Sequence, residues 1–138
     1  NPMVYYEQLI QEYKKTILVS DSPFNNPVIK YLKKESNVDV VSSNLAEDFN
    51  ILLNARNLAT SGVGTFASAA ALSSKKLKNL YYSNLYFKHH LNPSLVRNVN
   101  HHQYEFDNYY DIGTVWTGNK NQVNKMLSEK VIVRKLEP

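Results

Sequence analysis

The sequence feature that most constrains the fold is a regular alternation of helix-like and strand-like patterns over the first 82 residues. Short runs of β-branched or apolar residues predict strands at 16–20, 38–42, 57–61 and 77–82. Amphipathic spacing, capping residues or small side chains predict helices at 3–15, 27–36, 44–55 and 65–74. Pro27 can occupy the first turn of the second helix, and Asn44, with Glu47 three residues later, can cap the third. Such alternation with short connections is typical of a parallel sheet with helices on both faces. We therefore expect an α/β, Rossmann-like fold with a mostly parallel sheet of four or more strands.

The last third of the sequence has a weaker pattern. Residues 83–116 are rich in Asn, His and Tyr and show no clear period, whereas 119–128 predict one helix and 131–133 form a short apolar run. The length of 138 residues fits one domain of ordinary size. We therefore expect a single domain over 1–138 whose C-terminal third, from about residue 83 onward, is irregular.

The composition argues against several classes of protein. The sequence has no cysteine, which excludes disulfides, thiolate metal sites and a Cys nucleophile, and it has no Asn-x-Ser/Thr sequon. Both absences favour a reducing compartment, so we expect a cytoplasmic location. No apolar run reaches the roughly 18–20 residues that a membrane span needs. The net charge of +4 is too dilute for a nucleic-acid footprint, although it would help to hold an anionic ligand.

Polar turns follow three of the predicted strands, at the sheet edge where ligands bind in open parallel sheets. They are Asp21-Ser22, Ser42-Ser43 and Ser61–Phe66. In the third turn, Gly62 and Gly64 allow a positive φ and a close approach of the backbone to a ligand. Thr65 adds a hydroxyl at a helix start, where free amides and the helix dipole favour an anion. A simpler alternative is that both glycines only form a tight turn, because a short Gly-x-Gly pattern is weakly specific.

Two aspartates and four histidines complete the polar candidates. Asp48 lies in the first turns of a predicted helix, where its carboxylate could accept hydrogen bonds from a nucleotide base or ribose. Alternatively, Asp48 is only an acidic residue that the helix dipole stabilises at a helix start. Asp21 directly follows the first predicted strand. The histidines, at 89, 90, 101 and 102, form adjacent pairs, and neighbouring side chains on a strand or helix point apart. We therefore expect no metal site.

Taken together, these motifs resemble the donor-binding half of fucosyltransferase-like GT-B glycosyltransferases. The likeness is to the superfamily of α-1,2-, α-1,6- and protein O-fucosyltransferases, and it covers roughly residues 16–128. The stretches that carry it are ILVSDSP, VVSSNLAEDFNILLNARNLATSGVGTFASAAALSS and the tail HHQYEFDNYYDIGTVWTGNKNQVNKML. The matching residues are Ser20-Asp21, Asp48 with 52–55, and Gly64-Thr65-Phe66. The Gly-Thr-Phe part is the most specific of these.

The resemblance implies a nucleotide-sugar-binding domain whose donor is a GDP-sugar, with a glycan acceptor and no metal or other cofactor. The diphosphate would be held at Gly62, Gly64, Thr65 and Phe66, while Asp48 and Asp21 would complete the donor site. Enzymes of this kind also have an N-terminal Rossmann-like half with a basic His-x-Arg-Arg-type motif, which this sequence lacks. We therefore expect this chain alone to bind nucleotides weakly and to transfer no sugar, and we assign no catalytic residue.

A second hypothesis is a non-catalytic Rossmann-like module, used for binding or regulation, that has lost sugar transfer. A Lys/Arg-rich half elsewhere in the same or another chain would favour the glycosyltransferase, and its absence would favour the module.

Overall fold

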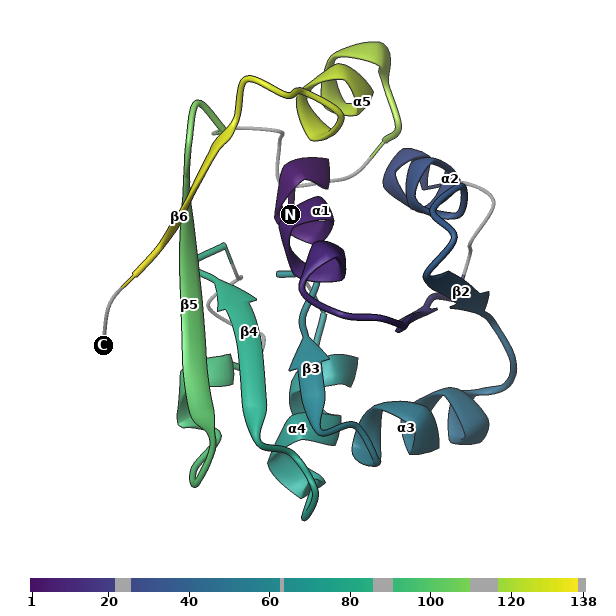
Figure 1. Cartoon of the computed structure of the whole chain (residues 1–138), viewed down its shortest axis with the longest axis vertical. Coiled ribbons are helices and arrows are strands. Elements are labelled where there is room, and N and C mark those ends of the chain that lie inside the picture. Colours follow the sequence, from purple (N-terminus) through teal and green to yellow (C-terminus); the bar gives the residue numbers. More distant parts are fainter. Residues whose placement is uncertain (22–25, 63, 86–90, 110–116, 137–138) are drawn as a thin grey trace. The chain divides into compact units, whose positions relative to one another are not determined.

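The computed structural model describes residues 1–21, 26–62, 64–85, 91–109 and 117–136 (Figure 1). Its elements are, in order, α1 (Met3–Gln11), β1 (Thr16–Val19), α2 (Pro27–Leu32), β2 (Val38–Val41), α3 (Leu45–Leu53), β3 (Asn57–Ala59), α4 (Phe66–Ser73), β4 (Asn79–Ser83), the 3-10 helix η1 (Pro93–Leu95), β5 (Asn100–Asp107), α5 (Lys120–Met126) and β6 (Ile132–Lys135). The predicted alternation of helices and strands over the first 82 residues is confirmed, and the fold is mixed α/β with mainly parallel pairing.

The strands hydrogen-bond into two sheets. β1 and β2 form a parallel pair, while the other sheet has the order β3–β4–β5–β6. The expectation of one sheet containing all four early strands is therefore wrong. The alternation of patterns predicts parallel neighbours, but it does not specify whether β2 and β3, which are only four and three residues long, pair with each other.

The chain divides into two compact units, each with its own core. Unit 1 comprises Asn1–Ser42 and Phe106–Val133, and unit 2 comprises Ser43–Glu105 and Arg134–Pro138. The core of unit 1 consists of buried apolar residues from α1, α2, β2 and α5: Met3, Ile10, Val28, Leu32, Val38 and Met126. The core of unit 2 consists of Leu58, Ala71, Leu77, Leu80, Tyr82 and Val96.

Side-chain hydrogen bonds mark the start of α2 and the end of α1 in unit 1. Asn26 accepts hydrogen bonds from Val28 N and Ile29 N, and Pro27 occupies the first helical position of α2, as the sequence predicts. Asn37 Nδ2 donates to Ile10 O at 2.9 Å and to Tyr13 O at 3.0 Å. These bonds satisfy carbonyl groups at the end of α1, which stops at Gln11 and not at the predicted residue 15.

An aromatic cluster packs the chain after β5 onto α1 within unit 1. Tyr5 is fully buried, and its ring contacts Phe106 edge-on at a centroid distance of 5.7 Å; Phe106 in turn contacts Tyr109 at 5.8 Å. Among the described residues, the buried Tyr109 hydroxyl has no hydrogen-bond partner. Burial raises the pKa of Tyr109 to about 12 and also raises the pKa of Tyr6.

We expect Tyr109→Phe to be neutral or stabilising by up to about 1 kcal/mol at pH 7, because it removes an unsatisfied buried hydroxyl. A tyrosine whose pKa is raised in the folded state contributes stability that is present below its unfolded pKa and lost as pH rises through the folded value. Wild-type stability should therefore fall between pH 10 and 12, and the fall should be smaller by about 1 kcal/mol or more in Tyr109→Phe. Urea unfolding at pH 8, 10 and 11.5 measures this difference. If the wild-type protein and Tyr109→Phe lose equal stability at alkaline pH, the pKa of Tyr109 is not raised by folding.

The sheet of unit 2 is parallel through its first three strands. β3 pairs with β4, and β4 with β5, in parallel. Leu136 N donates to Gln103 O at 2.8 Å and Arg134 pairs with Glu105 at 3.2 Å, so β6 runs antiparallel to β5. The run at 131–133, whose role the sequence leaves open, thus leads into an edge strand.

An amide ladder crosses the three parallel strands. Asn57, Asn79 and Asn100 occupy matching register positions. Asn79 Nδ2 donates to Asn57 Oδ1 at 2.8 Å, and Asn100 Nδ2 donates to Asn79 Oδ1 at 3.1 Å. Stacked amides of this kind support in-register parallel strands. The ladder therefore reinforces the register that brings the carboxyl ends of β3 and β4 together.

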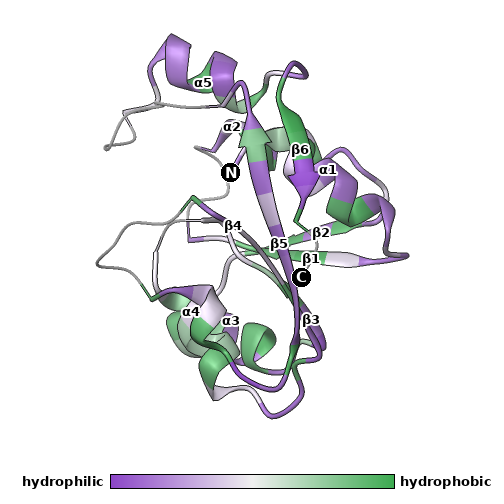
Figure 2. Cartoon of the chain, turned by 90° about the vertical axis from the view of Figure 1, so that its left-hand side faces the viewer, coloured by the Kyte–Doolittle hydropathy of each residue, from purple (hydrophilic) through white to green (hydrophobic). Residues whose placement is uncertain are grey.

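The eight-residue strand β5 lies in the segment that the sequence predicts to be irregular. Its residues are mostly hydrophilic, and Tyr104 is its one fully buried side chain (Figure 2). Contacts with other segments replace apolar alternation here: the His102 ring stacks on Tyr81 of β4 at 4.4 Å, and His101 Nε2 lies 2.8 Å from Val96 O, just after η1. β5 is therefore defined by its pairing with other strands, which the local sequence pattern does not indicate.

Candidate functional site

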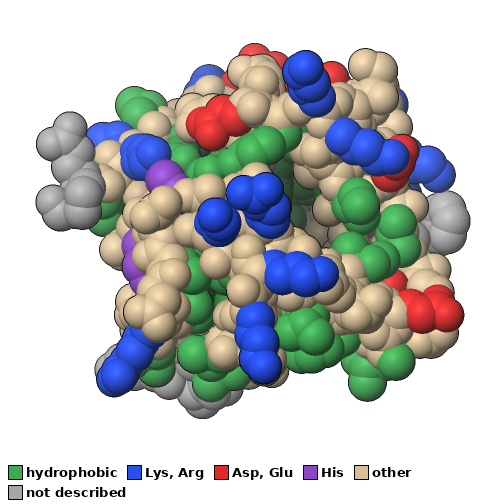
Figure 3. Space-filling view, turned by 60° about the horizontal axis from the view of Figure 1, so that its bottom comes forward, with side chains coloured by type: hydrophobic (Ala, Val, Ile, Leu, Met, Phe, Trp, Pro, Cys, Tyr) green, Lys and Arg blue, Asp and Glu red, His purple; other side chains and the backbone are tan. Residues whose placement is uncertain are grey.

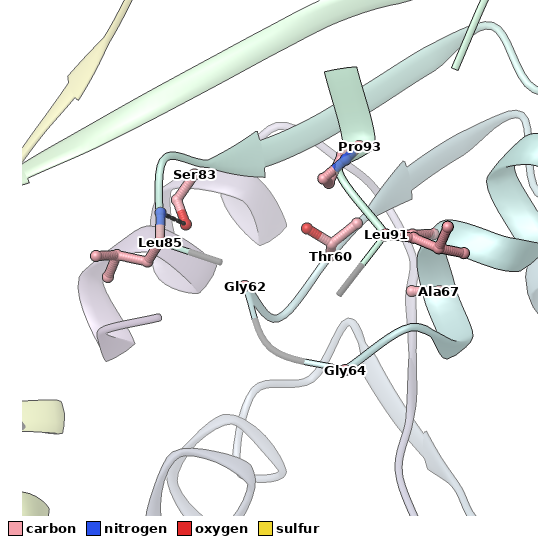
Figure 4. Close-up of a pocket in the computed structure, with 9 residues that line it drawn as sticks. Thr60, Gly62, Gly64, Ala67, Ser83, Leu85, Leu91 and Pro93 are labelled. Carbon is pink, nitrogen blue, oxygen red and sulfur yellow. Dashed lines mark hydrogen bonds between the residues drawn. The ribbon is translucent and has the colours of Figure 1, made fainter. Parts of the chain in front are cut away.

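The candidate site is the turn that joins β3 to α4 in unit 2 (Figure 4). After Ala59, Thr60 N donates to Tyr81 O at 2.9 Å, which prolongs the pairing with β4. Gly62 and Gly64 both have positive φ, at 86° and 83°, a region that side chains with a Cβ rarely adopt. Thr65 is the N-cap residue of α4. The predicted strand–glycine turn–helix arrangement is therefore present.

A small recess lies against this turn. Buried residues with hydroxyl groups line it, namely Thr60, Ser68 and Ser83, each exposed by less than 5%, together with Gly62 and Gly64. Leu85 N donates to Ser83 Oγ at 3.2 Å (Figure 4). Among the described residues that line the recess none is charged. Its lining combines these neutral polar groups with the apolar side chains of Ala67, Leu85, Leu91 and Pro93.

The outer rim of the turn is open to solvent. Gly64 and Thr65 are exposed, and a Cβ built on Gly64 would meet no heavy atom within 4 Å. The positive φ of Gly64, rather than crowding, therefore requires glycine there. The Thr65 side chain forms no capping hydrogen bond. The first amides of a helix have no partner within the helix itself.

Phe66 has a packing role that the sequence does not reveal. Its half-buried ring meets Phe49 of α3 edge-on, with 5.4 Å between ring centroids. This contact helps to hold α3 against α4. The side chain of Phe66 therefore positions the turn, and only its backbone amide is oriented for a ligand by the helix start.

Asp48 is buried on α3 and serves the preceding turn. Ser43 N donates to the two carboxylate oxygens of Asp48 at 3.1 and 3.4 Å. Asn44 caps α3 by accepting from Glu47 N at 3.0 Å, which confirms the predicted cap. Hydrogen bonds from the Ser43 hydroxyl and from Asn44 lower the pKa of Glu47. Both acids thus shape the entry into α3.

The sequence-predicted residues are distributed over both units. Gly62, Gly64, Thr65 and Phe66 lie on one turn of unit 2, and Asp48 is linked to them through the packed helices α3 and α4. Asp21 is exposed, follows β1 and belongs to unit 1. The structure therefore groups five of the six candidates in unit 2.

The sequence interpretation missed Ser68 and Ser83 as lining residues of the recess. Ser83 is the last residue of β4, so the rule that ligands bind at the carboxyl ends of strands could have found it. The predicted strand ends one residue earlier, at 82. Ser68 had no signal beyond its place in a small-residue helix.

The described residues offer neither a metal-binding cluster nor a membrane-spanning helix. Within the described ranges, no group of three or more His, Asp or Glu residues could hold a metal ion. No helix in the same ranges is both long and apolar enough to cross a bilayer. His101 and His102 make different contacts, with Val96 O and with the Tyr81 ring, while 89 and 90 lie outside the described residues.

Comparisons with protein-family models, with curated proteins and with solved structures gave no match. Function is therefore inferred from the geometry of the site itself.

Proposed function

We propose that this chain is the donor-binding, Rossmann-like part of a fucosyltransferase-like GT-B glycosyltransferase and that it takes a GDP-sugar. The observation that carries the proposal is the turn between β3 and α4. Two glycines with positive φ bring an exposed backbone to the start of an eight-residue helix, at the carboxyl end of a parallel strand. A diphosphate suits this position, because helix-start amides and the helix dipole both favour an anion.

The polar groups at the turn divide into an outer and an inner set. The Thr65 hydroxyl and the first amides of α4 lie at the exposed rim, where a diphosphate would bind. Thr60, Ser68 and Ser83 line the recess behind it, whose volume of about 10 Å³ is too small for a sugar or ribose, so these residues would support the turn without contacting the donor. Each hydrogen bond to a charged group is worth about 1.5–3 kcal/mol. Because the rim is open to water, we expect the lower value.

The proposed partners are a nucleotide sugar, a glycan acceptor and a second Rossmann-like half. Asp48 would contact the base or ribose through its α3 position, in addition to its hydrogen bonds with Ser43. A second candidate function is a non-catalytic binding or regulatory module. It is favoured by the absence of charged residues among the described lining of the recess, since leaving-group assistance needs positive charge.

Calorimetric titration with GDP, UDP and pyrophosphate tests the diphosphate assignment. Thr65→Ala should weaken GDP binding up to about tenfold, and Thr65→Ser should restore it, because one hydroxyl bond is removed and returned. Gly64→Val should weaken GDP and pyrophosphate binding further, because a branched residue is strained at φ 83°.

Gly118→Val is the matched control, since Gly118 also has a positive φ, of 68°, but lies on a turn of unit 1. It should reduce stability without changing the affinity for GDP. Circular dichroism shows whether each variant is folded. Unchanged diphosphate affinity in a folded Gly64→Val protein would mean that the glycines serve the turn alone.

A further inference from the structure

A second hollow of unit 2 shares no lining residue with the recess. It lies between the end of α4 with its following turn and the segment from η1 to β5. We call it the basic groove and define it by Ala71, Leu72, Ser74, Lys75, Leu77 and 95–99. It differs from the recess because cationic side chains, Lys75 and Arg97, lie among its apolar ones.

The apolar part of the basic groove has a buried floor and exposed walls. Leu77 and Val96 form the floor and are exposed by 7% and 3%. Leu72 and Leu95 remain 46% and 61% exposed. Grouped apolar side chains left in water commonly mark a protein interaction site. The exposed leucines therefore provide surface that a partner could cover.

The charged side chains of the basic groove are all positive, and no acidic side chain lies near them in the sequence. Between Asp48 and Glu105 the sequence contains no acidic residue but has Arg56, Lys75, Lys76, Lys78, Lys88 and Arg97. Lys75 and Arg97 line the groove, and neither forms an ion pair within the part of the chain that the structure describes. Figure 3 shows one face of the molecule on which Lys and Arg side chains alternate with exposed apolar ones. The complementary ligand is both apolar and anionic.

From this charge and shape we infer that the basic groove binds a short acidic peptide segment of a partner protein. Leucine-sized side chains of the segment would fill the floor between Leu72 and Leu95, and its carboxylates would pair with Lys75 and Arg97. A flat bilayer would reach the walls but not the recessed floor formed by Leu77 and Val96. Single-stranded nucleic acid binds most strongly where aromatic side chains stack on its bases, and the described lining of the groove contains no aromatic residue.

Selection from a random dodecapeptide phage library against the full chain provides the first test. We expect enrichment of peptides that combine Asp or Glu with Leu, Ile or Phe. The affinity of the best peptide should fall about tenfold or more in the double variant Lys75→Glu/Arg97→Glu, because attraction becomes repulsion. It should also fall in Leu95→Ser, which alters an exposed side chain. Lys130→Glu in unit 1 is the control and should change affinity less than about twofold.

A charge-swapped peptide provides the second test. If its acidic residues are replaced by lysines, it should bind the double variant better than the wild-type chain. Anionic phosphatidylserine vesicles and a single-stranded oligonucleotide are tested in parallel. Enrichment of neutral or basic peptides, no dependence on Lys75 and Arg97, or groove-dependent binding of vesicles or oligonucleotide alone would overturn the proposal. This inference does not depend on nucleotide binding, so the two proposals can fail separately.

Discussion

Leu80→Ala is expected to lower the free energy of unfolding of unit 2 by about 2–5 kcal/mol. Leu80 is fully buried as the second residue of β4, pairs with Leu58 of β3 in the parallel register and belongs to the apolar core of the unit. Truncation removes buried apolar surface and leaves a cavity, and strands on both sides limit how far the core can collapse around it. The same change should loosen the carboxyl end of β3, which positions the glycine turn.

Urea unfolding followed by far-UV circular dichroism measures the effect of Leu80→Ala, and amide hydrogen exchange on β3 to β5 localises it. Leu45→Ala is the control, because Leu45 is 76% exposed on α3 and its truncation should change stability by less than about 0.5 kcal/mol. A loss below about 1 kcal/mol in Leu80→Ala would show that the core of unit 2 does not depend on β4 as described.

Asp48→Ala is expected to cost about 1.5–3 kcal/mol, because a buried carboxylate that accepts the Ser43 amide is lost. The amide of Ser43 would then lack its acceptor at the entry into α3. Asp48→Asn should cost less, since its amide oxygen can still accept one hydrogen bond. Leu45→Ala is again the control, because Leu45 lies on the same helix and is 76% exposed.

The same variants separate the structural and binding roles of Asp48. Chemical denaturation gives the stability of each protein, and titration with GDP and UDP gives its base preference. If Asp48 also contacts the nucleotide, Asp48→Asn should reduce the preference for GDP while the protein stays folded. Unchanged stability in Asp48→Ala would contradict the hydrogen bonds with Ser43, and an unchanged preference in folded Asp48→Asn would remove Asp48 from the proposed donor site.

Features that depend on a few adjacent residues, such as helix starts, caps and turns, could be predicted from the sequence. The Pro27 start of α2, the Asn44 cap of α3 and the Gly62–Gly64 turn are properties of a few adjacent residues, and all are present. The four early strands also follow from short apolar or β-branched runs, although only β4 is buried along most of its length and Ile17 of β1 is 49% exposed. The sequence therefore predicts the elements and the position of the turn.

Long-range pairing could not be predicted in the same way. The division into two sheets depends on which strand edges join, and β5 is defined by partners 21 or more residues away. The recess has the same origin, because Ser83 joins Thr60 only through the register of β3 and β4. The lengths of α1 and α2 were overestimated, since tertiary hydrogen bonds from Asn37 end α1 before its amphipathic pattern does.

The amide ladder has a consequence for the order of folding. Asn57 and Asn79 are separated by 22 residues, and Asn79 and Asn100 by 21, so each rung closes a chain loop that includes α4 or η1. Parallel strands cannot form as hairpins, and the entropy of closing such loops must be lost before their pairing contributes stability. The helices of unit 2 should therefore form before the ladder does, and the glycine turn acquires its final shape only when β3 and β4 close.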